Sequence, residues 1–283
     1  MPEAPRDDAE RQQHEQPVEL TPRERRLVEQ RSRPRAAVLH ETIRLEGEQE
    51  LHRPVSSLGW SALAAGLSMG FSLVSMGLLR ALLPATPWRP LLTTLGYCVG
   101  FLIVVLGRQQ LFTENSLTPV LPLMQNRDRQ TLLRVLRLWG IVLAGNLIGA
   151  FVFAVVVGNT AVFSPDVKLA FGEIGREAIE GGFWIHLLRG VFAGWLIALM
   201  VWMLPSDGSR AFVVFVTTYV IGVGRLSHVI AGSVETLYLV ATARAGWGEY
   251  LGHFFVPVLI GNVLGGASLV AALNHAQVAS DTP

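Results

Sequence analysis

The sequence holds few of the residues that mark most kinds of functional site. It has one cysteine, Cys98, which excludes an internal disulfide and a cysteine metal cluster. Only 16% of its 283 residues are charged, the net charge is +1, and the basic residues form no stripe, so we expect no nucleic-acid partner. His-Glu-x-x-His, nucleophile-elbow and glycine-rich phosphate-loop motifs are absent, and the histidines are scattered. We therefore predict neither an enzyme nor a metal or cofactor site.

Long apolar runs are abundant instead, and 51% of the residues are hydrophobic. A helix that spans a membrane needs about 20 mainly apolar residues. Stretches of this kind, two of them short, occupy residues 61–79, 91–106, 138–157, 185–204, 212–223 and 254–273. The sequence therefore predicts an all-α integral membrane protein with six transmembrane helices, located in a bacterial inner (plasma) membrane.

The polar segments divide the chain and orient it. We expect a disordered tail over 1–35, an amphipathic surface helix over 36–55, a six-span domain over 56–275 and a tail over 276–283. A charged tail with incidental helicity is the alternative for 36–55. Arginines crowd the connection 126–137, and Arg210 lies two spans later, so these loops and both termini are predicted to be cytoplasmic. The segment 158–181 then lies outside.

The two halves of the six-span domain, at about 56–158 and 181–275, repeat each other. Gly107-Arg108 is matched by Gly224-Arg225, and Gly145-Asn146 is matched by Gly261-Asn262 at nearly equal spacing. Three spans in each half would insert the halves in opposite orientations, as in the inverted repeats of transport folds. Glycines at four-residue spacing indicate close helix packing, with a direct ligand role as the alternative. For the two asparagines, bridging to a neighbouring broken helix and lining a pore both remain open.

Each half also carries charge between its apolar segments. Arg108 and Glu114 lie in the first half, and Arg225, His228 and Glu235 lie in the second. A charge at membrane depth costs about 2.5–3.5 kcal/mol or more unless it is paired or hydrated, and irregular backbone is tolerated there only where it is buried or lines a cavity. We interpret both segments as interrupted helices that form the walls of one site. A cluster of buried ion pairs between the halves, such as Glu114 with Arg225, is the alternative.

Leu111-Phe112-Thr113 followed by Asn115, His228 in the second interrupted segment, and Gly261-Asn262 in the last span resemble the motifs of the formate/nitrite transporter family. The resemblance covers about residues 40–275. It implies an aquaporin-like 3+3 inverted repeat in which spans two and five are broken. It also implies a homopentamer in the lipid membrane, with a separate pore in each subunit.

This resemblance assigns pore roles to residues of both halves. Thr113 would place its hydroxyl against the central His228, and Leu111 would form part of a hydrophobic constriction. Further pore positions would be Phe112, Tyr97, Phe101, Ile221 and Asn262, with Asn146 as the counterpart of Asn262; charged residues beside the pore would be Arg108, Glu114, Arg225 and Glu235. For His228, a satisfied buried histidine is the structural alternative.

The implied function is a membrane channel or transporter for small monovalent weak-acid anions such as formate and nitrite, with His228 giving pH-dependent permeation. The sequence departs from the family at both interrupted segments. Arg108 and Arg225 stand where the family usually has a small residue or glycine, and Gln110 and Ser227 stand where it usually has an acid. These exchanges leave open a pore for a small neutral or hydrosulfide-like solute, or a family member that does not conduct.

Overall fold

The computed structural model describes residues 20–31, 36–205 and 209–271, in two separate units of 1–34 and 35–283. In the first unit, helix α1 (Pro22–Arg31) begins with a capping box. The Thr21 N–H donates to the Glu24 carboxylate over 2.9 Å, and the Glu24 N–H donates to the Thr21 hydroxyl over 3.3 Å. This cap makes part of the segment 1–35 helical, where we expected disorder. The rest of that segment and the tail 276–283 lie outside the described residues.

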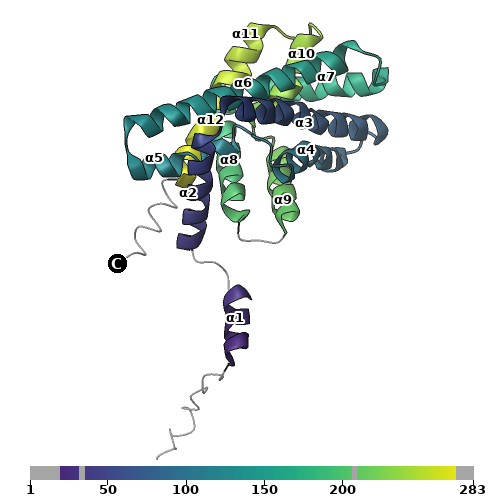
Figure 1. Cartoon of the computed structure of the whole chain (residues 1–283). Helices are drawn as coiled ribbons and strands as arrows, with labels where there is room; N and C mark the ends of the chain where they lie inside the picture. Colours follow the sequence, from purple (N-terminus) through teal and green to yellow (C-terminus); the bar gives the residue numbers. More distant parts are fainter. Residues whose placement is uncertain (1–19, 32–35, 206–208, 272–283) are drawn as a thin grey trace, which may run out of the picture. The chain divides into compact units, whose positions relative to one another are not determined.

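In the second unit every regular element of the described residues is a helix (Figure 1). The bounds are α2 (Ala36–His52), α3 (Val55–Leu82), α4 (Arg89–Leu106), η2 (Glu114–Ser116), α5 (Val120–Asn126), α6 (Arg129–Asn159), α7 (Pro165–Ile179), α8 (Phe183–Met203), α9 (Arg210–Val223), α10 (Val229–Ala241), α11 (Trp247–Glu249), η3 (Tyr250–Phe255), α12 (Val256–Val263) and η4 (Leu264–Ala271). Five segments are long and apolar enough to cross a membrane: α3, α4, α6, α8 and Trp247–Ala267. Helices α9 and α10 are apolar but shorter.

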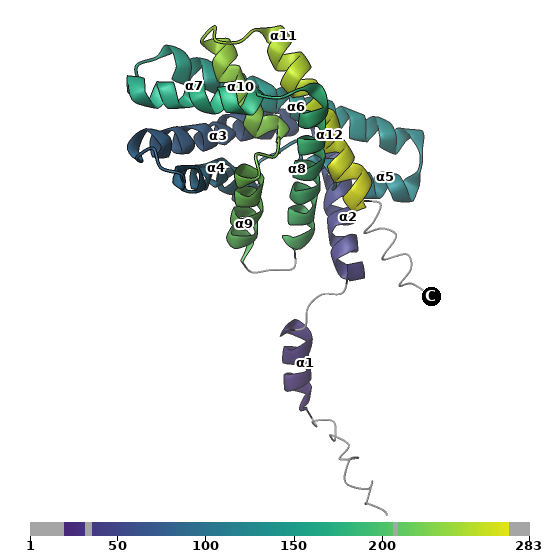
Figure 2. The same cartoon turned by 180° about the vertical axis from the view of Figure 1, so that it is seen from behind.

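The long helices pack closely because small residues lie at their contacts. Helix α3 packs against α4 and α6, and α8 packs against α12; α10 lies beside α6 and α7 in both views (Figures 1 and 2). A Cβ atom on Gly66 of α3 would overlap the Asn146 carbonyl of α6, and one on Gly194 of α8 would overlap the Asn262 carbonyl of α12. These contacts favour the packing interpretation of the spaced glycines.

Helix α2 occupies most of the segment 36–55, which we expected to form a helix on the membrane surface. It buries Ile43, Gly47 and Leu51, and it packs against α5, α6 and α8. A Cβ atom on Gly47 would overlap the Thr118 carbonyl, so the contact with the chain before α5 is close. Part of its apolar face therefore contacts the protein itself, while Val38 and Leu45 remain exposed. Its position relative to a membrane stays a prediction.

Large apolar side chains cover much of the outer surface of the long helices. Trp184 on α8 is 73% exposed, Phe212 on α9 is 65% exposed and Ile148 on α6 is 57% exposed. A protein surrounded by water rarely exposes so much contiguous apolar surface. This surface fits a bilayer, and the protein is a multi-pass membrane protein.

Candidate functional site

Two cavities approach each other from opposite ends of α4. The first, about 240 Å³ in volume, is lined by the beginning of α4, by α7 and by His228; we name it the α7-side cavity. The second, about 410 Å³, is lined by the end of α4, by α2 and by Leu111; we name it the α2-side cavity. Phe101 in the middle of α4 and Thr113 are fully buried and line neither cavity. A closed barrier therefore separates the two cavities.

The barrier contains one polar pair in apolar surroundings. The Thr113 Oγ1 and His228 Nε2 atoms lie 2.7 Å apart, although 115 residues separate them in the sequence. The Phe101 ring stands edge-on to the imidazole, with 4.8 Å between ring centroids, and the Tyr97 ring follows 5.1 Å from Phe101. Leu111 is completely buried on the other side. An ion without its hydration shell would cross such a barrier only at high cost.

His228 is also the N-terminal cap of α10. Its Nδ1 atom accepts the backbone N–H groups of Ile230 and Ala231, over 3.3 and 3.2 Å. Because an accepting nitrogen carries no proton, the neutral ring holds its proton on Nε2 and donates it to Thr113 Oγ1. The Thr113 hydroxyl hydrogen then remains, and none of the described residues accepts it. The barrier thus offers one fixed hydroxyl donor.

The helices before the two interruptions end in the same way. Helix α4 ends with a Gln109 N–H bond to the Val104 carbonyl and an Arg108 N–H bond to the Val105 carbonyl. This is a Schellman motif, and Arg108 takes its left-handed position at φ 51°. Helix α9 repeats the motif, with Arg225 at φ 50°. Both arginines therefore occupy a backbone conformation that glycine adopts more readily.

We expect Arg108→Gly to stabilise the protein by about 1 kcal/mol, because glycine removes the steric cost of the left-handed conformation. Arg108 forms no ion pair with any described residue, so little is lost with the side chain. The measurement is the melting temperature of the detergent-purified chain. Arg129→Gly, at the regular helical start of α6, is the matched control and should not stabilise. A lower melting temperature for Arg108→Gly would contradict the expectation.

Two asparagines hold the interruptions in place with matching hydrogen bonds. Asn146 of α6 accepts the Phe112 N–H over 2.9 Å and donates to the carbonyls of Ala62 and Gln110, both over 2.8 Å. Asn262 of α12 does the same in the other half. It accepts the Val229 N–H over 2.8 Å and donates to the carbonyls of Gly190 and Ser227 over 2.8 and 2.9 Å. Each amide is fully buried and ties an interruption to the first long helix of its half.

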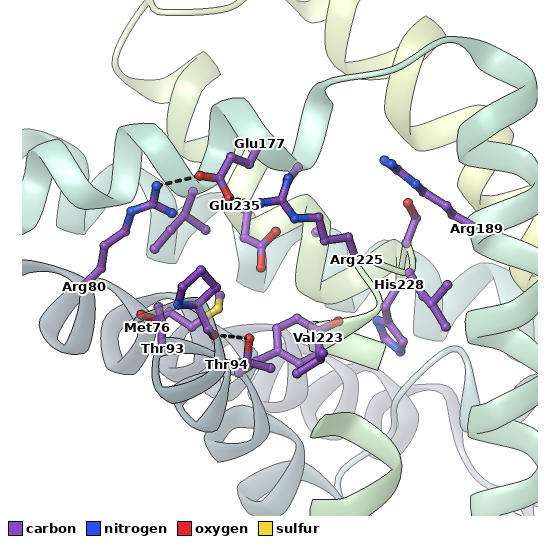
Figure 3. Close-up of a pocket in the computed structure, with 18 of the residues that line it drawn as sticks. Met76, Arg80, Thr93, Thr94, Glu177, Arg189, Val223, Arg225, His228 and Glu235 are labelled. Carbon is purple, nitrogen blue, oxygen red and sulfur yellow. Dashed lines mark hydrogen bonds and ion pairs between the residues drawn. The ribbon is translucent and has the colours of Figure 1, made fainter. Parts of the chain in front are cut away.

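The α7-side cavity is rich in arginine. Arg80, Arg89, Arg189 and Arg225 line it, against Glu177 and Glu235. The Glu177 carboxylate holds two of them, Arg80 over 2.5 Å and Arg225 over 3.5 Å. In Figure 3 the Glu235 carboxylate points into the cavity, below Glu177 and to one side of Arg225. The formal excess of positive charge favours a small anion in this cavity.

The α2-side cavity has the opposite charge balance. Its charged residues are Glu46 and Glu50 of α2, Glu114, Arg108 and Arg210. The buried Glu114 Oε1 atom has no hydrogen-bond partner among the described residues. Nowhere in the described ranges do three or more His, Cys, Asp or Glu side chains gather so that they could hold a metal ion.

The structure also shows where Glu114, Glu235, Phe112 and Ile221 lie, four further residues that the sequence singled out. Glu114 does not pair with Arg225, because the two line different cavities and Arg225 reaches Glu177. Glu235 lies inside α10 rather than in the interruption. The Phe112 ring packs against Trp139 on α6, 6.0 Å between centroids, and lines neither cavity.

Ile221 is fully buried at the end of α9 and also lines neither cavity, as is true of Phe101 and Thr113, so the pore roles of Phe112 and Ile221 stay predictions. The residues that sequence reasoning missed are Arg80, Arg89, Glu177 and Arg189 of the α7-side cavity. The sequence contains one local pattern that could have pointed to this cavity. Glu173 and Glu177 lie one helical turn apart on α7, and both bind Arg80.

Comparison with known proteins gives the family and the fold of this chain. The formate/nitrite transporter family profile matches residues 37–276. Inner membrane protein YfdC of Escherichia coli is 40% identical over 276 residues, which make up 95% of this chain and 89% of that protein. The formate channel FocA of Haemophilus influenzae is 23% identical over 76% of this chain and 84% of its own. A solved pentameric formate channel with formate bound has the same fold, with a TM-score of 0.66 and 18% identity over 80% of this chain and 98% of that one. The chain belongs to the formate/nitrite transporter family.

Proposed function

We propose that this protein is a membrane channel for small monovalent weak-acid anions of the formate and nitrite type, in which His228 makes permeation pH-dependent. The observation that carries the proposal is the single Thr113–His228 pair, 2.7 Å apart, in an otherwise apolar barrier between two cavities. The relatives named as formate channels support the substrate class.

The charge distribution supplies a path for such an anion. The arginines of the α7-side cavity raise the local concentration of anions next to His228. The Thr113 hydroxyl then donates to the anion at the barrier, and the fixed bond from His228 Nε2 keeps that hydroxyl oriented. Because the remaining walls are apolar, a weak acid crosses more cheaply as the neutral acid than as the anion.

His228 would couple this barrier to pH through the α10 cap. A second proton on Nδ1 removes the acceptor of the Ile230 and Ala231 N–H groups and places a positive charge at the barrier. The charge attracts an anion, whereas the lost cap loosens the start of α10. Both effects grow as the pH falls.

The proposal includes the architecture of the pore. We propose six spans in a 3+3 inverted repeat, with α4 and α5 forming one broken span and α9 and α10 the other. The matching asparagine contacts and the matching helix ends support this repeat. We further propose a homopentamer in the bacterial inner membrane, with both termini and the α2-side cavity facing the cytoplasm, as the arginines of 126–137 suggest.

The test is uptake by proteoliposomes that contain the purified chain. We expect radiolabelled formate and nitrite to enter at least about tenfold faster than in protein-free liposomes, with faster uptake at lower pH. A swelling assay with small uncharged solutes addresses the alternative, a pore for neutral species. The ion pair of Arg225 with Glu177 gives that alternative some support, because it neutralises part of the positive charge. Swelling without anion uptake would replace the proposal, and neither activity would indicate a non-conducting family member.

A further inference from the structure

Two carboxylates flank the barrier, one in each cavity. Glu235 lies on α10 seven residues after His228, so the two side chains share one face of the helix, with Gly232 between them. All three residues line the α7-side cavity. Glu235 is 8% exposed, and its carboxylate forms no ion pair or hydrogen bond with any described residue. Figure 3 shows it directed into the cavity.

Glu114 stands next to Thr113 on the other side of the barrier. It lines the α2-side cavity together with Leu111, and its Oε1 atom is buried without a partner in the described part of the chain. A buried ionised carboxylate without hydrogen bonds is costly, whereas the protonated acid is tolerated and carries a transferable proton. The two glutamates therefore have the same chemistry at the two faces of one barrier.

His228 is poorly placed to carry that proton itself. Its Nδ1 atom is occupied by the two N–H groups of the α10 cap, and its Nε2 proton is engaged with Thr113. Accepting a proton breaks the cap, and losing one breaks the bond to Thr113. A carboxylate in an open cavity can gain and lose a proton without disturbing any hydrogen bond of the structure.

We propose that Glu114 and Glu235 exchange protons with the permeating weak acid, one on each side of the barrier, and so couple anion flux to proton flux. This inference rests on the proposed function and adds the groups that move the proton. When the anion enters from the α7 side, the Glu235 carboxyl gives its proton to the anion, which forms the neutral acid and leaves the Glu235 carboxylate. On the α2 side Glu114 first releases its own proton into the α2-side cavity, and its carboxylate then takes the proton of the neutral acid, which leaves as the anion.

The cycle balances because each glutamate is restored through its own cavity. Glu235 takes up a proton from the water of the α7-side cavity, and Glu114 releases one into the α2-side cavity. One proton and one anion therefore cross together, and no net charge moves. Transport in the opposite direction reverses the same steps.

The charged neighbours of each glutamate set the conditions for this exchange. Around Glu235 they are Arg80 of α3, Arg89 and Tyr97 of α4, Glu177 of α7, Arg189 of α8, and Arg225. Tyr250 of η3, which packs against α10, bonds to Ser233 and completes the titratable groups on that side. Around Glu114 they are Arg108, Arg210, Glu46 and Glu50. Both sets contain cations and acids, so neither glutamate is neutralised by one dedicated partner.

The experiment compares proton and formate movement in proteoliposomes of the full chain. Formate uptake is measured with radiolabel, and the internal pH is followed with a trapped dye. We expect the wild type to move about one proton with each formate. Glu235→Gln and Glu114→Gln should each slow the coupled uptake by about tenfold or more, which is the lower end of the effect of losing a proton-transfer group. The remaining flux should carry charge and respond to an imposed membrane potential.

The matched control is Glu41→Gln on the exposed face of α2, which lines neither cavity and should keep the wild-type ratio of protons to formate. Glu235→Asp, which retains a carboxyl, should restore coupling. Wild-type proton coupling in both Gln variants would overturn this inference and leave the channel function intact. Wild-type liposomes that take up no formate would instead remove the proposed function.

A second measurement needs no variant. Dicyclohexylcarbodiimide labels protonated carboxyl groups in apolar surroundings, and mass spectrometry of the wild-type chain locates the label. We expect labelling of both glutamates that decreases as the pH rises, and no label on Glu173. A chain that is unlabelled at Glu114 and Glu235 would also overturn the inference.

Discussion

We expect His228→Asn to slow formate uptake into proteoliposomes by about a hundredfold, the effect of removing one fixed donor that orients an anion site. The part of the pH dependence that comes from protonation of His228 should be lost, because asparagine does not titrate, whereas the part that Glu114, Glu235 and the weak acid itself supply should remain. Asparagine is chosen because its side-chain oxygen caps a helix well. The Ile230 and Ala231 N–H groups therefore keep an acceptor, and α10 should still begin at Val229.

The His228→Asn variant loses the hydrogen bond between the side chain at position 228 and Thr113. The shorter amide does not replace the Nε2 contact, so the Thr113 hydroxyl is no longer held toward the barrier. His253→Asn, at an exposed position in η3, is the matched control and should leave both the rate and the pH profile unchanged. Wild-type uptake by His228→Asn with an intact pH profile would show that the Thr113–His228 pair has no part in permeation.

The sequence was sufficient for the features that repeat or that follow from local patterns. The apolar runs predicted the long helices, and the two glycine–asparagine motifs identified the side chains that hold the interruptions. The sequence left two roles open for these asparagines, bridging to a neighbouring broken helix and lining the pore. Their amides are bonded to backbone groups and line neither cavity, which matches bridging. A repeat can indicate that a residue is needed, but it does not name the backbone group that the residue binds.

The charges at the interruptions show where sequence reasoning ends. Arg108 and Arg225 stood out as departures from the family, and a pairing of Glu114 with Arg225 was one explanation. That pairing is wrong, because the barrier lies between the two side chains. Arg225 instead meets Glu177, from a helix that the sequence placed only in an outer loop. Contacts between elements so far apart in the chain leave no local pattern.

The asparagine contacts lead to the largest expected effect on stability. We expect Asn146→Leu to cost about 3–5 kcal/mol, because it leaves the Phe112 N–H and the Gln110 carbonyl buried without partners, at about 1–3 kcal/mol each, and removes a further bond to Ala62. For a chain of this size the melting temperature in detergent should fall by about 10 °C. Formate uptake should fall with it, since Asn146 holds the segment that carries Leu111 and Thr113.

Asn159→Leu makes the same substitution at the exposed end of the same helix, and we expect a change of less than about 0.5 kcal/mol there. Asn262→Leu should behave like Asn146→Leu, because it leaves the Val229 N–H and the Ser227 carbonyl without partners. Equal losses in the two halves would show that both interruptions depend on the same contact. A wild-type melting temperature for Asn146→Leu would mean that packing of Phe112 against Trp139 is enough to hold the first interruption. In that case Asn146 would not be needed to hold the interruption, and lining the pore would become the better explanation of this residue. Its three hydrogen bonds to buried backbone groups argue against that explanation.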